Sequence, residues 1–229
     1  MNPPLHSDAI GPKRHILLVE DHPVTREGFA KLLSYEPDLK VCGQAGTECE
    51  ALAAVQAANP DLVIIDISLP GGNGLELIKK LSRQRPALPL LVLSTFDETV
   101  YAGRSLQAGA RGYLMKSAAT GEILDAIRIV LNGKTYLSKR MNEHLVGSLI
   151  HGRFPAVASE AELLSDRELE IFTLIGQGQS TTQIAAALKL SPHTVATHRT
   201  HIQEKLRLES LGELTCRAAQ WVQRQSDPH

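Results

Sequence analysis

The segment LVIIDISLPGGNG, residues 62–74, decides the fold that the sequence predicts. Four apolar residues are followed at once by a carboxylate, Asp66, and then by a loop that contains three glycines. Because a half-exposed strand alternates polar and apolar residues, residues 62–65 are expected to form a strand that is covered on both faces. Burying a charge at the end of such a strand is costly without a partner. We therefore expect Asp66 to meet a specific partner.

Short apolar runs alternate with helical patterns through the first part of the chain. The expected strands are residues 15–19, 40–44, 61–65, 88–94 and 112–115. The expected helices are residues 24–35, 47–58, 74–84, 98–108 and 120–132. Five strand–helix units predict an α/β domain in which helices cover both faces of a parallel sheet and ligands bind beyond the carboxyl ends of the strands.

The rest of the chain shows no strand signal. Residues 138–151 are compatible with a helix, and residues 151–162, with proline and small residues, are expected to be a linker. Four short helices are expected at 166–176, 180–188, 192–207 and 210–224. The predicted organisation is a disordered arm (1–13), an α/β domain (14–137), a linker with a helix (138–163) and a small all-α domain (164–225).

Composition sets the broad class of the protein. A net charge of −1 over 229 residues gives no sign of a chain that binds polyanions along its whole length. The three cysteines form no CxxC pair, which favours a reducing cytoplasm. No apolar run approaches the roughly 18 residues of a membrane helix, and the N-terminal residues lack the apolar core of a signal peptide. We expect a cytoplasmic protein with no membrane partner.

Charged side chains follow several of the expected strands. Glu20 and Asp21 come after the first strand, Asp66 after the third, Ser94 ends the fourth, and Lys116 follows the fifth. In the predicted topology these strand ends share one edge of the sheet. Repulsion among three close carboxylates favours a hard divalent cation, and Mg²⁺ prefers oxygen ligands. Lys116 and Ser94 are then left to hold an anion.

This set of groups suits phosphoryl transfer. A carboxylate can act as a covalent nucleophile, and a metal and a lysine neutralise the charge on the equatorial oxygens of the phosphoryl group. Each residue alone has an ordinary explanation: a lone aspartate at a strand end is commonly a helix cap, and a lone lysine is commonly solvated. The joint spacing over four strand ends favours one common site.

Residues 14–137 resemble the receiver domain of two-component response regulators. The resemblance is carried by LLVEDHP (17–23), DLVIIDISLPGGNG (61–74), VLST (92–95) and GARGYLMK (109–116). It implies that a histidine kinase phosphorylates Asp66, and that Mg²⁺ is held by Glu20, Asp21, Asp66 and the backbone carbonyl of Ser68. It also implies that Ser94 and Lys116 bind the phosphoryl oxygens and that Tyr113 is an aromatic switch. Many receivers have proline after the lysine, whereas here Ser117 follows.

Residues 180–206, STTQIAAALKLSPHTVATHRTHIQEKL, have the pattern of a helix-turn-helix. Ser180 and Ser191 are expected helix caps, and Pro192 suits a first helical position. The inner side of the second helix carries Val195, His198, Ile202 and Leu206, and the outer side carries His193, Thr197, Thr200, His201 and Glu204. Residues 160–229 have a net charge of −2, but residues 189–207 have +3. The basic charge is therefore local to the helix that would enter the major groove.

Residues 164–220 resemble a LuxR-type domain, on the spacing of LSDRE, IA, SPHTV, TH and KL. Together the two resemblances imply a NarL/FixJ-type response regulator that binds double-stranded DNA, dimerises on activation and is not a dedicated enzyme. The residues expected to contact DNA are Lys189, His193, Thr194, Thr197, Arg199, Thr200, His201 and Lys205. Ala196 stands where relatives usually carry a cation.

Three other interpretations compete with this one. An Mg²⁺-dependent phosphatase with an aspartate nucleophile usually needs an acid/base carboxylate two residues later, where this chain has Ser68. A receiver-like domain could also serve dimerisation in a regulator that binds DNA without phosphorylation. Zinc binding by His193, His198 and His201 is disfavoured because no cysteine or carboxylate in the sequence pattern completes a site.

Overall fold

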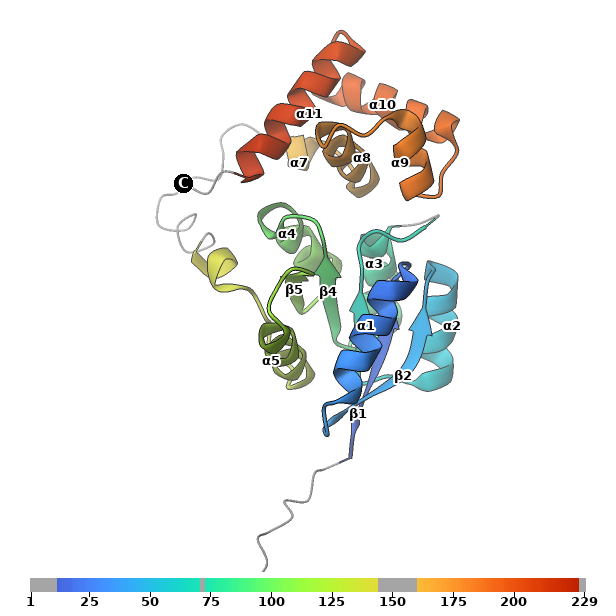
Figure 1. Ribbon diagram of the computed structural model, residues 1–229, viewed down its shortest axis with the longest axis vertical. Coiled ribbons are helices and arrows are strands. Elements are labelled where there is room, and N and C mark those ends of the chain that lie inside the picture. The colour runs from blue at the N-terminus through green and yellow to red at the C-terminus, as the bar shows by residue number, and fades with distance from the viewer. Residues whose placement is uncertain (1–11, 71–72, 144–159, 227–229) are drawn as a thin grey trace, which may run out of the picture.

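The computed structural model describes residues 12–70, 73–143 and 160–226, and its N-terminal part contains a five-stranded parallel sheet (Figure 1). The strands are β1 (Arg14–Val19), β2 (Leu39–Ala45), β3 (Leu62–Ile65), β4 (Leu90–Ser94) and β5 (Gly112–Met115). Their order is β2-β1-β3-β4-β5, so the direction of winding reverses between β1 and β3. This is a flavodoxin-like sheet, in which ligands bind beyond the carboxyl ends at that reversal.

Helices cover both faces of the sheet. They are α1 (Pro23–Ser34), α2 (Glu48–Ala58), α3 (Gly74–Gln84), α4 (Glu98–Ala108) and α5 (Thr120–Leu131). On β1, Leu17 and Val19 pack into a core with α2, α3 and α4, whereas Ile16 and Leu18 pack into a second core with α1 and α5. The continuous apolar runs of the sequence have this cause, because alternate side chains of a strand enter opposite cores.

The C-terminal part is a bundle of helices. They are α7 (Glu160–Leu163), α8 (Asp166–Gly176), α9 (Thr181–Ala187), α10 (Pro192–Leu206) and α11 (Leu211–Ser226). Ser165, Ser180 and Ser191 precede α8, α9 and α10, and each side chain accepts a hydrogen bond from the backbone N–H three residues later. These caps fix where the helices begin, as expected for Ser180 and Ser191. The α9–α10 pair is the predicted helix-turn-helix.

The linker prediction was wrong at its end. Residues 160–163 form α7, and the buried Glu160 accepts a hydrogen bond from Arg217 Nε at 2.8 Å. This part of the expected linker belongs to the C-terminal bundle through a contact made 57 residues along the chain. Of the helix expected at 138–151, residues 139–143 are helical, and the remainder lies outside the described residues. The arm expected at 1–13 also lies almost entirely outside them.

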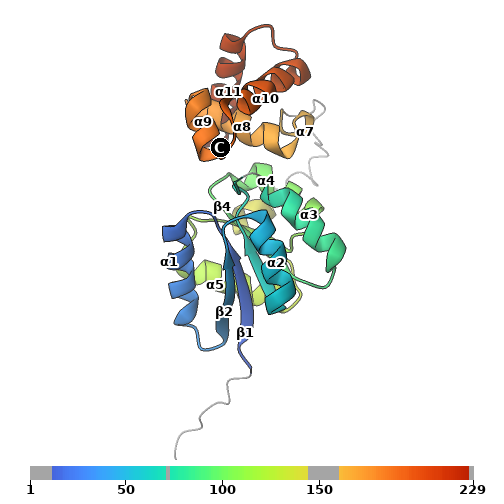
Figure 2. The same ribbon diagram turned by 90° about the vertical axis from the view of Figure 1, so that its right-hand side faces the viewer.

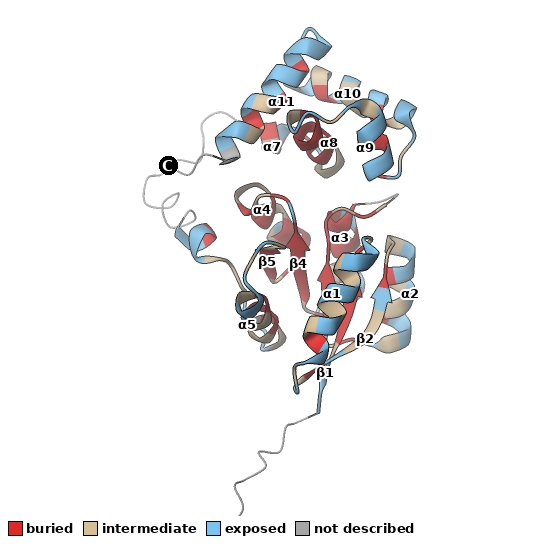
Figure 3. Cartoon of the chain, in the orientation of Figure 1, coloured by how far each residue is buried: buried red, intermediate tan, exposed pale blue. Residues whose placement is uncertain are grey.

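The helical bundle sits over the carboxyl ends of the sheet strands. Figures 1 and 2 show α8 and α9 on the side of the bundle that faces α3 and α4. Figure 3 shows buried segments on α3, α4 and the strands of one part and on α8 of the other. One apolar cluster includes residues of both parts, from Phe96 and Tyr101 to Leu169 and Phe172. No helix in the described part of the chain is long and apolar enough to span a membrane.

Candidate functional site

Asp66 lies directly after β3, where the buried strand ends. Its backbone N–H donates to the carbonyl of Val19 at 2.9 Å, which ties it to the end of β1. The residue is 3% exposed. The Lys116 ammonium donates to Asp66 Oδ2 at 2.8 Å, so the expected partner is the lysine that follows β5. The other oxygen, Oδ1, is buried and accepts no hydrogen bond from the described residues.

The loop after β3 passes very close to Asp66. The N–H of Gly74 donates to the Ile67 carbonyl at 2.8 Å, and a Cβ on Gly74 would lie 2.2 Å from the Asp66 carbonyl oxygen. Only glycine fits at such a distance from the backbone. Asn73 then caps α3 by accepting from the N–H of Leu75 at 2.8 Å. The glycine-containing segment therefore lets α3 begin directly beside the phosphoacceptor candidate.

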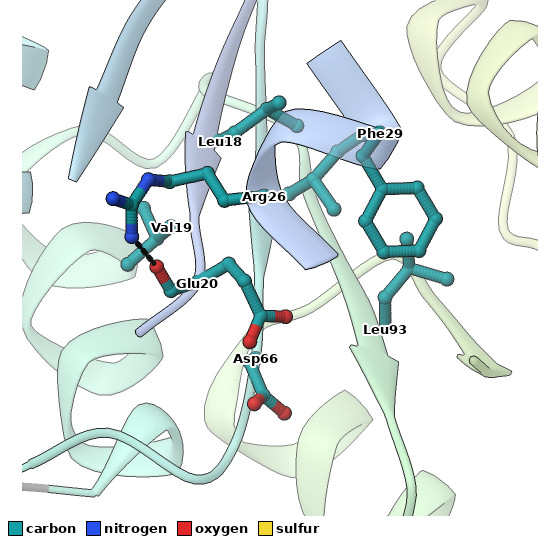
Figure 4. Close-up of a pocket in the computed structure, with 8 residues that line it drawn as sticks. Leu18, Val19, Glu20, Arg26, Phe29, Asp66 and Leu93 are labelled. Carbon is teal, nitrogen blue, oxygen red and sulfur yellow. Dashed lines mark hydrogen bonds between the residues drawn. The ribbon is translucent and has the colours of Figure 1, made fainter. Parts of the chain in front are cut away.

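The acidic pair lies at the end of β1, next to Asp66. Glu20 is 5% exposed, and its carboxylate is directed toward Asp66 in Figure 4. Lys116 Nζ lies 2.5 Å from Glu20 Oε2 and 2.8 Å from Asp66 Oδ2, so one ammonium bridges the two acids. The Glu20 carbonyl accepts from Arg26 Nη1 at 2.6 Å, which holds the strand end against α1. His22 Nδ1 lies 2.7 Å from Asp21 Oδ1.

Burial dominates the electrostatics of this crevice. It raises the pKa of Asp66 to about 6; the Lys116 charge opposes that rise, and the Glu20 charge adds to it. Burial by itself would lower the pKa of Lys116, but the charge and hydrogen bond of Asp66 and the contact with Glu20 raise it overall. Charged groups can remain in so buried a place because they compensate one another.

The donor set fits a magnesium ion. Asp21 Oδ1 and Asp66 Oδ1 are buried oxygens without a hydrogen bond from the described residues, although His22 is close to the first. Glu20, Asp21 and His22 present ligand atoms within 4.8 Å of one another. Asp66 is outside that group, and Lys116 lies between its carboxylate and that of Glu20. Carboxylate oxygens with free lone pairs are what Mg²⁺ requires.

Ser94 and Tyr113 lie on the neighbouring strands and are both buried. The Tyr113 hydroxyl donates to the Phe96 carbonyl at 2.7 Å, and Ser94 Oγ accepts from the Phe96 N–H at 3.2 Å. Tyr101 of α4 stacks on the Phe96 ring at 4.8 Å between centroids. Ser94 and Tyr113 thus both form hydrogen bonds with the backbone of Phe96, which lies in the loop between β4 and α4. The Ser68 N–H contributes to the site by lowering the pKa of Asp66.

The outer face of α10 is accessible. His193, Thr197, Thr200 and His201 are exposed, as is Ala196, while Val195 and Ile202 are fully buried on the inner face. Thr197 and Thr200 each donate to the carbonyl four residues earlier, at 3.1 and 3.3 Å, and Thr194 Oγ1 lies 2.8 Å from Ser191 Oγ. These short polar groups form the surface that would face bases.

The cations near α10 are not equally available. Arg199 Nη1 donates to Thr181 Oγ1 at the start of α9, at 3.1 Å, and Lys205 Nζ lies 2.5 Å from Glu168 Oε2 of α8. Both side chains therefore hold the helices of the domain together. Lys189 lies in the turn between α9 and α10 with a positive φ of 50°, and its ammonium points to the domain that contains the sheet, 3.5 Å from Asp21 Oδ2.

The structure supplies a carboxylate that the sequence pattern did not place near the histidines. Ligand atoms of Glu168, His198 and His201 lie within 4.8 Å of one another, and His193 is outside this group. The Lys205 ammonium already forms a salt bridge with the Glu168 carboxylate. Burial and the charge of Arg167 lower the pKa of His198. The reason given against a zinc site, that no carboxylate completes it, therefore does not hold for His198 and His201, while the expectation of no zinc stays a prediction.

Sequence reasoning also missed the residues that join the two domains. Asp166 accepts from Lys79 Nζ at 3.0 Å and from Arg104 Nη1 at 2.5 Å. Glu170, one turn further along α8, is fully buried. No sequence signal marks them, since charged residues at these helical positions are ordinarily solvated.

Comparisons with known proteins agree with this geometry. Residues 16–128 match the model of the response regulator receiver domain, and residues 162–218 match that of the bacterial regulatory proteins of the luxR family. The oxygen regulatory protein NreC of Staphylococcus epidermidis (strain ATCC 12228 / FDA PCI 1200) is 36% identical over 204 residues, which cover 87% of this chain and 94% of that protein. NreC of Staphylococcus aureus (strain MRSA252) is 36% identical over 203 residues, with the same coverage.

Solved structures have the same architecture. A LuxR-family two-component response regulator from Aurantimonas sp. SI85-9A1 is 29% identical with a TM-score of 0.57, covering 60% of this chain and 99% of that one. RcsB from Salmonella enterica serovar Typhimurium, bound to promoter rprA with the phosphomimetic BeF3⁻, has a TM-score of 0.60 at 22% identity over 94% and 100% of the two chains. The chain described here belongs to the NarL/FixJ family of DNA-binding response regulators, in which a receiver domain precedes a LuxR-type helix-turn-helix domain, and it acts in two-component regulation of transcription.

Proposed function

We propose that a sensor histidine kinase phosphorylates Asp66 and that this controls DNA binding by α10. The observation that carries the proposal is the state of the Asp66 carboxylate: it is buried, one oxygen is held by Lys116, and the other has no hydrogen-bond partner among the described residues. That free oxygen attacks the phosphorus atom. The bond from phosphorus to the donor breaks, and its electron pair leaves with the donor.

The neighbouring groups have separate tasks in this proposal. Glu20, Asp21, Asp66 and the Ser68 carbonyl hold Mg²⁺, which, when bound, neutralises charge on the phosphoryl oxygens. Lys116 moves from its bridge between the two acids to the phosphoryl group. Ser94 contacts a phosphoryl oxygen, and because it shares Phe96 with Tyr113, its movement would rearrange the tyrosine and the surface of α4. The protein is then a regulator that catalyses its own modification and is no dedicated enzyme.

DNA recognition is assigned to the outer face of α10. Its support is the exposure of His193, Thr197, Thr200 and His201 on the second helix of a helix-turn-helix. Lys189, Arg199 and Lys205 are the candidates for phosphate contacts. Each would have to leave its present partner, which is Asp21, Thr181 or Glu168 respectively. We also propose a homodimer on activation, since the RcsB structures include two dimers bound to two parallel DNAs.

The experiment is phosphorylation by a small donor. Incubation of the full chain with acetyl phosphate and Mg²⁺ should add the mass of one phosphoryl group, and Asp66→Asn should remove that addition. Lys116→Ala should keep binding Mg²⁺ but respond weakly, because the lysine contacts the phosphoryl group and not the metal. Labelling that persists in Asp66→Asn would place the modification elsewhere.

A further inference from the structure

The residue that follows the acidic pair, His22, takes no part in capping α1. It stands directly before Pro23, at the position where serine, threonine, aspartate or asparagine usually caps a helix with a side-chain oxygen, but its own side chain makes no cap hydrogen bond. The imidazole is 69% exposed and turns instead toward the carboxylates of Glu20 and Asp21. The start of the helix therefore does not explain why a histidine stands here.

The ring nitrogen Nδ1 of His22 lies beside one oxygen of each acid. It is 2.7 Å from Asp21 Oδ1 and 3.4 Å from Glu20 Oε1. The backbone N–H of His22 donates to the same Oε1 at 3.1 Å, which keeps that oxygen beside the ring. The second oxygen of Glu20 lies 2.5 Å from Lys116 Nζ. The second oxygen of Asp21 lies 3.5 Å from Lys189 Nζ. One nitrogen and two carboxylate oxygens are thus gathered at one point, with the lysines on the far side of each acid.

The oxygen nearest the ring lacks a hydrogen bond. Asp21 Oδ1 belongs to a side chain that is 8% exposed, and it accepts no hydrogen bond from the described residues although His22 Nδ1 is only 2.7 Å away. A neutral imidazole with its proton on Nε2 offers a lone pair at Nδ1. Adjacent ligands of an octahedral ion with bonds of about 2.1 Å lie about 3 Å apart. The distances from Nδ1 to the two acids, 2.7 and 3.4 Å, fall on either side of that value.

We propose that His22 is a ligand of the metal ion at this site, through Nδ1 and together with Glu20 and Asp21. This nitrogen raises the preference of the site for divalent transition-metal ions relative to Mg²⁺. Magnesium takes oxygen ligands, whereas imidazole suits iron, nickel, copper and zinc ions. The inference rests on the proposed function, since it concerns the same metal site, and it adds one ligand and the class of metal that this ligand favours.

A nitrogen ligand affects the two classes of metal ion differently. His22→Gln keeps a polar side chain but exchanges the nitrogen donor for an amide oxygen, which serves Mg²⁺ at least as well. A transition-metal ion loses its preferred ligand in this variant. Removing a group that merely supports a metal ligand already costs about tenfold or more in affinity, so His22→Gln should weaken Co²⁺ binding by at least about tenfold and Mg²⁺ binding by less than about twofold.

The test titrates CoCl₂ and, separately, MgCl₂ into the full chain by calorimetry. Proton NMR of the Co²⁺ complex is the second measurement, because a histidine bound through Nδ1 gives a strongly shifted Nε2–H signal that is present in H₂O and absent in D₂O. The unmodified chain should show this signal and lose it when excess MgCl₂ is added, and His22→Gln should lack it.

The matched control makes the same substitution at the other end of β1. His15→Gln lies in that strand, away from the carboxyl ends, and should change neither affinity and keep the shifted signal. Circular dichroism checks that each variant is folded. Labelling of Asp66 by acetyl phosphate and Mg²⁺ is measured on the same proteins.

The outcomes separate this inference from the proposed function. Weaker Co²⁺ binding in His22→Gln, with Mg²⁺ binding nearly unchanged and the shifted signal lost, supports a nitrogen ligand. Equal weakening of both ions, or no weakening of either, overturns it. A shifted signal that survives in His22→Gln also overturns it and assigns Co²⁺ to other histidines, such as His198 and His201 beside Glu168. Normal labelling of Asp66 alongside either failure leaves the proposed function standing, whereas an unmodified chain that is not labelled refutes the proposed function whatever Co²⁺ does.

Discussion

Replacing Gly176 with alanine should separate two helices that are in backbone contact. A Cβ at Gly176, the last residue of α8, would lie 2.3 Å from the Ala218 carbonyl oxygen and 2.6 Å from Val222 Cγ2. Reaching ordinary van der Waals distance from Ala218 requires α8 and α11 to move apart by about 1 Å, and overpacking of this kind costs about 1–3 kcal/mol. The gain in helix propensity from glycine to alanine, about 1 kcal/mol at most, is smaller at a helix end. We expect a net loss of stability.

The single tryptophan provides the assay. Trp221 of α11 is 8% exposed and lies 6.3 Å from the Phe172 ring of α8, between centroids, so its fluorescence reports on this pair of helices. A loss of about 2 kcal/mol should lower the urea midpoint of the fluorescence transition by roughly 1–2 M, for a slope of about 1–2 kcal/mol per M.

The matched control is the same substitution in open space. Gly28 lies inside α1, and a Cβ added there would have nothing within 4 Å, so Gly28→Ala should stabilise the receiver domain by up to about 1 kcal/mol. The two variants should thus shift stability in opposite directions. A Gly176→Ala protein whose fluorescence midpoint equals or exceeds that of the unmodified chain would refute the close packing of α8 on α11.

Two further predictions concern charge. Ala196→Lys, on the exposed face of α10, should steepen the slope of log affinity for DNA against log salt concentration by about 0.9, and it should raise the affinity for cognate and scrambled duplexes alike. The control Gln223→Lys adds the same charge on α11 and should change neither the slope nor the affinity. Equal slopes for the two variants would remove α10 from the DNA interface. Hydrogen bonds from Arg128 lower the pKa of Asp38, so this carboxylate stabilises the fold above its ordinary pKa and loses that contribution as the pH falls through the lower folded value. Asp38→Asn should therefore lower the free energy of unfolding by less than about 1 kcal/mol at pH 7, since the Arg128–Asp38 pair is partly exposed. In urea unfolding, this loss relative to the unmodified chain should become smaller below about pH 4. A loss that does not change with pH would rule out the charge of Asp38 as its cause.

The sequence by itself determined the architecture and the centre of the site. Continuous apolar runs separated by helical patterns specify a sheet buried on both faces. In the described parts of the receiver domain, each predicted end of a strand or helix agrees with the structure to within two residues. Since parallel strands end at one edge, the positions of Glu20, Asp66 and Lys116 in the sequence were enough to bring them together, and the structure has them in contact. The period of apolar residues and the succession of strands and helices along the chain are local properties, which a sequence carries directly.

Only the tertiary structure decided how the two domains meet and which cations are available. The sequence gives no sign that Lys189 and Lys205 differ in their contacts. In the structure, Lys189 forms an ion pair with Asp21 of the receiver and Lys205 with Glu168 of α8. No local pattern distinguishes Asp166 and Glu170 from solvated helix residues, but the folded structure buries Glu170 and joins Asp166 to two cations. These roles depend on the relative placement of folded surfaces across long separations in sequence, such as 87 residues from Lys79 to Asp166, and no local pattern encodes that placement.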